Sequence, residues 1–208
     1  MKSYEISNDK QACRDLLVTL TNEHTSPNKI ITLPSKTALC VKTFKQAWPT
    51  ANYIGIERDK DAFQEICKQG INCYLSDIRE YIHSQTLKTQ HVDMFFMDYY
   101  SYLNSNVIGD IKALLSNQNL VHKGKPLIIG LTLMKAMRGD KENTIDFMRE
   151  YIDNGRRINI ENNLSNIELA LSTFLSNEFP SATETTMLES IEYKTGVNMY
   201  FLVFKIIL

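Results

Sequence analysis

The chain has 208 residues, of which 43% are hydrophobic and 23% are charged, and these proportions are typical of a soluble globular protein. The length fits one domain with a sizeable core and leaves no room for a second full domain. Lys and Arg total 23 against 24 for Asp and Glu, so the domain as a whole exerts no general attraction on nucleic acid. Nucleic-acid binding would therefore need a local basic patch.

The cysteines and histidines do not form a metal-binding motif. No two of the four cysteines have CxxC spacing, and the four histidines are scattered, so we expect no structural zinc site. We expect the cysteines to be reduced thiols that serve mainly in packing. No apolar run reaches transmembrane length, and the first residues are too polar for a signal peptide. We therefore expect a cytoplasmic protein with no membrane partner.

The first third of the chain alternates between helix and strand patterns. Residues 9–24 predict a helix, which leads into a polar turn. Residues 29–34 form a short apolar run rich in β-branched residues, which predicts a strand. In the segment after it, Val41, Phe44 and Trp48 fall on one helical face. The pattern is strand and then helix.

The same unit follows again. Residues 52–57 predict a second strand, and the helix after it places Phe63, Ile66 and Cys67 inward. Gly70 is positioned to end that helix in the left-handed conformation. The repetition favours a β–α–β architecture.

Three further strands follow at 71–77, 92–98 and 126–133. A short helix is predicted at 79–88 and another at 107–115. The fourth strand, 92–98, is almost entirely apolar, which is typical of a strand buried on both faces of a parallel sheet. These units predict a three-layer sheet with helices on both sides.

The last third of the chain has a different pattern. Helices are predicted at 141–153 and 164–178, and two strand-like runs follow at 185–194 and 198–208. The three residues between these runs include Gly196, which allows a tight turn, so the pattern predicts a β-hairpin.

Candidate site residues follow four of the predicted strands, at the sheet edge where open α/β proteins bind ligands. They are Pro34 and Ser35 at the end of the first strand, Glu57 and Arg58 at the end of the second, Asp77 and Ile78 at the end of the third, and Asp98, Tyr99 and Tyr100 at the end of the fourth.

With these residues at the strand ends and a C-terminal hairpin, the chain resembles the class I S-adenosylmethionine-dependent methyltransferases over residues 29–208. The resemblance implies an α/β, three-layer Rossmann-like fold: a mostly parallel seven-stranded sheet closed by a C-terminal antiparallel hairpin. Residues 1–28 would be an N-terminal helical extension. The implied cofactor is S-adenosylmethionine, and no metal is required.

The resemblance implies that Glu57 holds the cofactor ribose, because an acid there can accept both hydrogen bonds of a diol. The alternative is that Glu57 is a solvated acid stabilised by a helix dipole. Arg58 beside it is a candidate cofactor-binding residue, with a surface charge as its alternative. Asp77 and Ile78 would bind the adenine amino group and ring, whereas the alternative for Asp77 is a helix cap.

The DYYS tetrad follows the buried fourth strand. It lies where methyltransferases that act on nucleobase amino groups carry a polar residue, two prolines and an aromatic residue, and here both prolines are absent. By the resemblance, Asp98 would hold or deprotonate the acceptor, and Tyr99 and Tyr100 would shape its pocket. The alternative is an aromatic cluster that packs at the edge of the core.

The loop after the first strand departs from the family pattern. The family carries an acid and several glycines there, whereas this chain has no glycine from Lys29 to Tyr53. Pro34 and Ser35 would border the methionine part of the cofactor, beside free N–H groups at a helix start. The departure supports an alternative in which the fold is kept and the activity is lost.

The leading hypothesis is methyl transfer to a nitrogen or oxygen acceptor on a nucleic acid or a small molecule. A catalytically inactive binding protein is the second, and an α/β enzyme for another nucleotide cofactor is the third, although no GxGxxG is present. A basic rim of the cleft, which nucleic acid would need, could be formed by Lys135, Arg138, Lys141, Arg156 and Arg157. The alternative is that these residues are ordinary solvated charges. The oligomeric state is left open.

Overall fold

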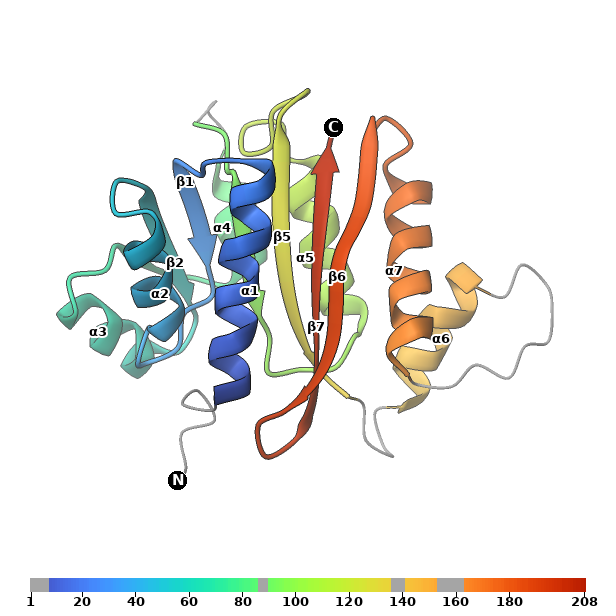
Figure 1. The fold of residues 1–208 in the computed structure, drawn as a ribbon, viewed down its shortest axis with the longest axis horizontal. Coiled ribbons are helices and arrows are strands. Elements are labelled where there is room, and N and C mark those ends of the chain that lie inside the picture. The colour runs from blue at the N-terminus through green and yellow to red at the C-terminus, as the bar shows by residue number, and fades with distance from the viewer. Residues whose placement is uncertain (1–7, 86–89, 136–140, 153–162) are drawn as a thin grey trace.

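The computed structural model describes residues 8–85, 90–135, 141–152 and 163–208, with only the backbone at 8 and 141–143. Its centre is one seven-stranded sheet with helices on both faces (Figure 1). The strands are β1 (Lys29–Thr32), β2 (Asn52–Glu57), β3 (Cys73–Leu75), β4 (Met94–Asp98), β5 (Pro126–Met134), β6 (Glu184–Lys194) and β7 (Asn198–Ile207).

The strand order is β3-β2-β1-β4-β5-β7-β6. Strands β1 to β5 pair in parallel, and β7 runs antiparallel to both β5 and β6. The predicted sheet with its C-terminal hairpin is confirmed, and Gly196 has the positive φ of 88° that the hairpin turn requires. The order reverses between β1 and β4, and this is where open α/β sheets form a crevice at their carboxyl edge.

The helices divide between the two faces of the sheet. They are α1 (Asn8–His24), α2 (Leu39–Ala47), α3 (Lys60–Lys68), α4 (Ile78–Ser84), α5 (Ser105–Ser116), α6 (Lys141–Ile152) and α7 (Leu164–Glu178). One buried core joins α1, α2 and α3 to the sheet, and a second joins α4, α5, α6 and α7 to it. Figure 1 shows α1 in front of the sheet and α5 behind it.

Alternate residues of the central strands enter opposite cores. Met94 and Phe96 of β4 face α1 and α2, whereas Phe95 and Met97 face α4 and α5. All four are at most 1% exposed, as expected for a strand that lies between two helical layers.

Helix α1 belongs to this packing. Leu17 is fully buried and lies against Gly130 of β5, where an added Cβ would approach the Leu17 Cδ2 atom to 2.8 Å. Glycine in a strand often marks such a close approach. Residues of α1 therefore share a core with the sheet.

Two details differ from the sequence prediction. Cys67 is exposed, because the buried stripe of α3 consists of Ala62 and Ile66, and a residue one position further along a helix is turned by about 100°. Strand β3 has only three residues, because its pairing with β2 begins at Cys73 and Asp77 already caps helix α4.

Buried His91 yields a prediction about pH. Its Nδ1 accepts a hydrogen bond from the backbone N–H of His122 at 3.0 Å, and its Nε2 lies 2.9 Å from the Pro126 carbonyl oxygen. The ring is therefore neutral, with the proton on Nε2. Burial lowers the pKa of His91 below its ordinary value.

Because the pKa of His91 is lower in the folded state, the unfolded chain takes up a proton more readily than the folded protein. The contribution of neutral His91 to stability is therefore complete above about pH 6.5, the ordinary pKa of histidine, and is lost as the pH falls towards the folded-state pKa. We expect the free energy of unfolding, measured in urea, to fall from about pH 7.5 to about pH 5.5. The fall should be smaller in His91→Gln, which does not titrate. An equal fall in both proteins would contradict the prediction.

Candidate functional site

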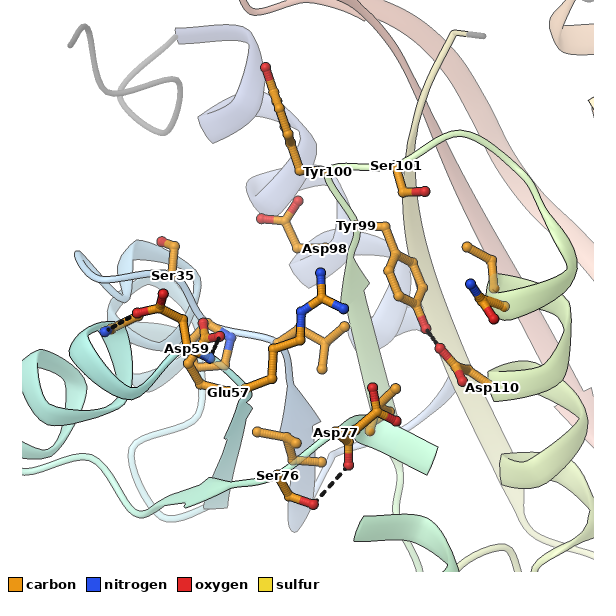
Figure 2. A pocket seen from close by; sticks show the side chains of 18 of the residues that line it. Ser35, Glu57, Asp59, Ser76, Asp77, Asp98, Tyr99, Tyr100, Ser101 and Asp110 are labelled. Carbon is orange, nitrogen blue, oxygen red and sulfur yellow. Dashed lines mark hydrogen bonds between the residues drawn. The ribbon is translucent and has the colours of Figure 1, made fainter. Parts of the chain in front are cut away.

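A cavity of about 1150 Å³ opens at the carboxyl ends of β1, β2, β3 and β4 (Figure 2). All nine residues predicted from the strand ends line it: Pro34, Ser35, Glu57, Arg58, Asp77, Ile78, Asp98, Tyr99 and Tyr100. Their proximity follows from the parallel strands, whose carboxyl ends meet at one edge. The chemical role of each residue stays a prediction.

The loop after β1 reaches a tight conformation without glycine. Ala38 has φ 49° and ψ 34°, and it is the one non-glycine residue with positive φ in the described ranges. This left-handed conformation costs about 1 to 2 kcal/mol. The backbone N–H of Ala38 donates to the Ser35 carbonyl at 2.9 Å, and that of Leu33 donates to the Phe96 carbonyl at 3.1 Å.

A glycine in the neighbouring strand β2 allows the loop after β1 to pack closely on the sheet. Pro34 packs over Gly55 of β2, where an added Cβ would lie 2.9 Å from the Pro34 Cγ atom and 3.1 Å from the Cys73 Sγ atom. Because Gly55 lies outside the first loop, the glycine-free sequence of that loop gave no sign of this packing.

Glu57 ends β2 and lies at the start of α3. Its Oε1 accepts a hydrogen bond from the backbone N–H of Asp59 at 2.8 Å, and Asp59 caps α3 by accepting from Ala62 N–H at 2.7 Å. The carboxylate of Glu57 therefore lines the cavity and also contacts the start of the helix. Binding a ribose diol would use the same carboxylate.

Asp77 is the N-cap of α4 and accepts a hydrogen bond from the backbone N–H of Arg79 at 2.9 Å. The capping interpretation is confirmed. Ile78, the first residue of α4, is 5% exposed and lies at the cavity wall. Contact of these two residues with adenine stays a prediction.

Asp98 is held through both carboxylate oxygens. Thr132 of β5 donates its hydroxyl to Oδ1 at 2.6 Å, and the ammonium of Lys10 in α1 lies 2.9 Å from Oδ2. The side chains of Lys10 and Asp98 are only 11% and 10% exposed. Sequence analysis missed Lys10, because its distance from Asp98 along the chain left no local signal.

The two tyrosines after Asp98 differ in their surroundings. Tyr99 packs against the core and donates its hydroxyl to Oδ2 of Asp110 at 2.7 Å. Burial and the Asp110 carboxylate both raise the pKa of Tyr99, so its phenol is neutral. Tyr100 is 57% exposed and points away from Asp98 and Tyr99 (Figure 2). Core-edge packing thus describes Tyr99 and not Tyr100.

Of the predicted basic rim, Lys135 is paired with Glu192 of β6 at 3.1 Å. Arg138, Arg156 and Arg157 lie outside the described residues, as does the side chain of Lys141. Within the described ranges, no three His, Cys, Asp or Glu side chains are grouped to hold a metal ion. Nor does any helix there combine the length and apolar character needed to cross a membrane.

No family model matches the chain. No curated protein matches it in sequence either. Solved structures do match it in fold. The N-methyltransferase NodS from Bradyrhizobium japonicum WM9, in complex with S-adenosyl-l-homocysteine, has a TM-score of 0.51 at 12% identity, over 97% of this chain and 89% of NodS.

The plantazolicin methyltransferase BpumL, in complex with the same compound, has a TM-score of 0.54 at 12% identity, over 98% of this chain and 93% of BpumL. Cofactor-bound Rv0187 from MTB has a TM-score of 0.51 at 11% identity, over 96% and 81% of the two chains. The Rossmann-like methyltransferase fold predicted from the order of the elements is therefore confirmed.

The packing of Pro34 on Gly55 can be tested by a double-mutant cycle. We expect Gly55→Ala to lower the free energy of unfolding by about 1 to 3 kcal/mol, because the new methyl group overlaps Pro34 and Cys73. Pro34→Ala removes the Cγ atom and should relieve part of this cost. Urea unfolding of the wild type, both single variants and the double variant measures the coupling. Strictly additive effects would show that the two residues do not pack as described.

Proposed function

We propose that this chain is an S-adenosylmethionine-dependent methyltransferase that transfers a methyl group to a nitrogen or oxygen acceptor. The observation that carries the proposal is that one cavity at the strand ends gathers all nine predicted site residues. The methyltransferase fold supports it, as does the S-adenosyl-l-homocysteine in NodS and BpumL. A cytoplasmic location is part of the proposal, consistent with four free cysteines.

The residues present fit the proposed cofactor. A cavity of about 1150 Å³ is larger than most small-molecule sites, which span about 300 to 1000 Å³, so it has room for cofactor and acceptor together. In this proposal Glu57 and Arg58 hold the ribose side, and Asp77 and Ile78 the adenine side. Pro34 and Ser35 border the methionine part.

The bound cofactor would supply a methyl group activated by its sulfonium, and the protein would contribute mainly positioning. Asp98 suits this role because Thr132 and Lys10 fix both of its oxygens. A carboxylate held in this way presents a defined negative charge with little freedom to rotate, so it can orient an acceptor N–H or O–H. Lys10 places a positive charge beside it.

A catalytically inactive binding protein is the second candidate, and the glycine-free loop with its left-handed Ala38 is the observation that favours it. Calorimetric titration with S-adenosylmethionine tests cofactor binding directly. If the wild-type protein binds none at millimolar concentration, the methyltransferase proposal is wrong.

Glu57→Ala should weaken cofactor binding in the same calorimetric assay by roughly 2 to 3 kcal/mol, the value of two charge-assisted hydrogen bonds. Asp61→Ala is the matched control, because Asp61 is an exposed acid in α3, the helix that follows Glu57. Asp98→Asn should stay within a few-fold of the wild-type affinity, since Asp98 is assigned to the acceptor. Unchanged affinity in Glu57→Ala would remove the ribose assignment.

The acceptor in this proposal is a nucleic acid or a small molecule. Exposed Tyr100 offers a surface on which a planar base could stack. If the acceptor is nucleic acid, single-stranded RNA or DNA should be retained in filter binding. Its affinity should fall with added salt, with a log–log slope of about 0.7 to 0.9 per neutralised phosphate.

Tyr100→Ala should weaken that nucleic-acid binding by about 1 to 3 kcal/mol, whereas Tyr74→Ala, at an exposed tyrosine outside the cavity, should not. Absence of retention even at low salt would leave the small-molecule acceptor as the remaining form of the proposal.

A further inference from the structure

Three elements around the cavity meet at one buried carboxylate, that of Asp110 in α5, whose side chain is 8% exposed. Its Oδ2 accepts the hydroxyl of Tyr99 at 2.7 Å. Its Oδ1 accepts from Arg79 of α4, at 3.0 Å from Nε and 2.9 Å from a terminal nitrogen. Asp110 therefore joins the end of β4 to the start of α4.

The charge of Asp110 makes these contacts mutually dependent. Burial raises the pKa of Asp110, and the hydrogen bonds from Tyr99 and Arg79 oppose that rise. A buried carboxylate is tolerated when it is paired and hydrogen-bonded, and removal of one partner leaves an uncompensated charge. The three side chains thus act as a unit, which we call the Arg79–Asp110–Tyr99 network.

Gly109 makes room for this network. An added Cβ at Gly109 would lie 2.5 Å from a terminal nitrogen of Arg79 and 2.9 Å from its Cζ atom, so the guanidinium packs directly on the helix backbone. The same guanidinium donates to the Asn106 carbonyl at 2.9 Å. Glycine inside a helix costs about 1 kcal/mol relative to alanine, and here it permits the close approach of Arg79.

Arg79 directly follows Asp77 and Ile78, the two residues that the proposed function assigns to adenine. Its side chain is tied to α5, and its backbone N–H donates to Asp77 Oδ1 at 2.9 Å. Nε and one terminal nitrogen of its guanidinium contact Asp110, and the same terminal nitrogen donates to the Asn106 carbonyl. This side chain is therefore the polar link between the adenine wall and Asp110 of α5, beside the apolar packing of Ile78 and Ile82 on that helix.

We propose that Arg79 is a positioning residue for nucleoside recognition: the Arg79–Asp110–Tyr99 network holds Asp77 and Ile78 at the spacing that fits an adenine ring. The inference rests on the proposed function, because it concerns the same cavity. A lysine cannot replace Arg79, since one ammonium cannot reproduce the two Asp110 contacts together with the Asn106 contact.

The test compares the affinity for S-adenosylhomocysteine with that for its inosine analogue, which lacks the adenine amino group, by calorimetry well below the unfolding temperature. Gly109→Ala displaces Arg79 without removing any polar group. We expect it to weaken S-adenosylhomocysteine binding about tenfold, as the loss of a residue that supports a ligand-binding group does in metal sites, and to reduce the preference over the inosine analogue. Arg79→Lys should weaken S-adenosylhomocysteine binding and reduce the preference over the inosine analogue in the same way.

Ser116→Ala is the matched control, because it places alanine at an exposed position of the same helix, and it should change neither quantity. A purely structural role would lower the stability of the variants and leave the preference for adenine intact. If Gly109→Ala or Arg79→Lys fails to fold, Tyr99→Phe, which removes one hydroxyl, replaces it and should reduce the same preference.

The outcomes separate the two proposals. Tight binding by the wild type with unchanged affinity and unchanged preference in the folded variants would overturn the positioning role and leave the proposed function standing. No binding by the wild type would overturn the proposed function and the inference that rests on it.

Discussion

The sheet must be covered on both faces, and the rest of the molecule follows from this constraint. Met94 and Phe96 of β4 point into one core while Phe95 and Met97 point into the other, so neither face of the central strand can meet water. Helices α2 to α5 connect the parallel strands β1 to β5, and such connections bring the carboxyl ends of these strands to one edge. The cavity lies at that edge because polar groups there can still be solvated.

Buried carboxylates at this edge are stabilised by groups from other elements. Asp98 is bound by Lys10 and Thr132, and Asp110 by Arg79 and Tyr99. Each acid is thus fixed from two sides, so the cavity wall is held together by charge as well as by apolar packing. A wall of this kind is already ordered before a ligand arrives, which reduces the entropy that binding must offset.

The sequence predicted the fold well because strand and helix periods are local properties. Strand β2 and helix α7 have the predicted bounds, and all nine candidate residues meet in one cavity. The partners of those residues could not be predicted. Lys10 and Arg79 carry no motif, and they become site residues only through tertiary contacts. The support of Pro34 by Gly55 was missed for the same reason, since it depends on the packing of neighbouring strands.

The contact between α1 and the end of β4 has a consequence for the nascent chain on the ribosome. Lys10 emerges early, but its partner Asp98 and the Thr132 hydroxyl that fixes Asp98 follow much later. Leu17 likewise waits for Gly130 of β5. Helix α1 can contact α2 before then, since Trp48 Nε1 donates to Asn22 Oδ1, but the apolar surface around Leu17 stays incompletely covered until β5 has been synthesised. Association with a chaperone during this interval would protect the apolar surface that the finished sheet later covers.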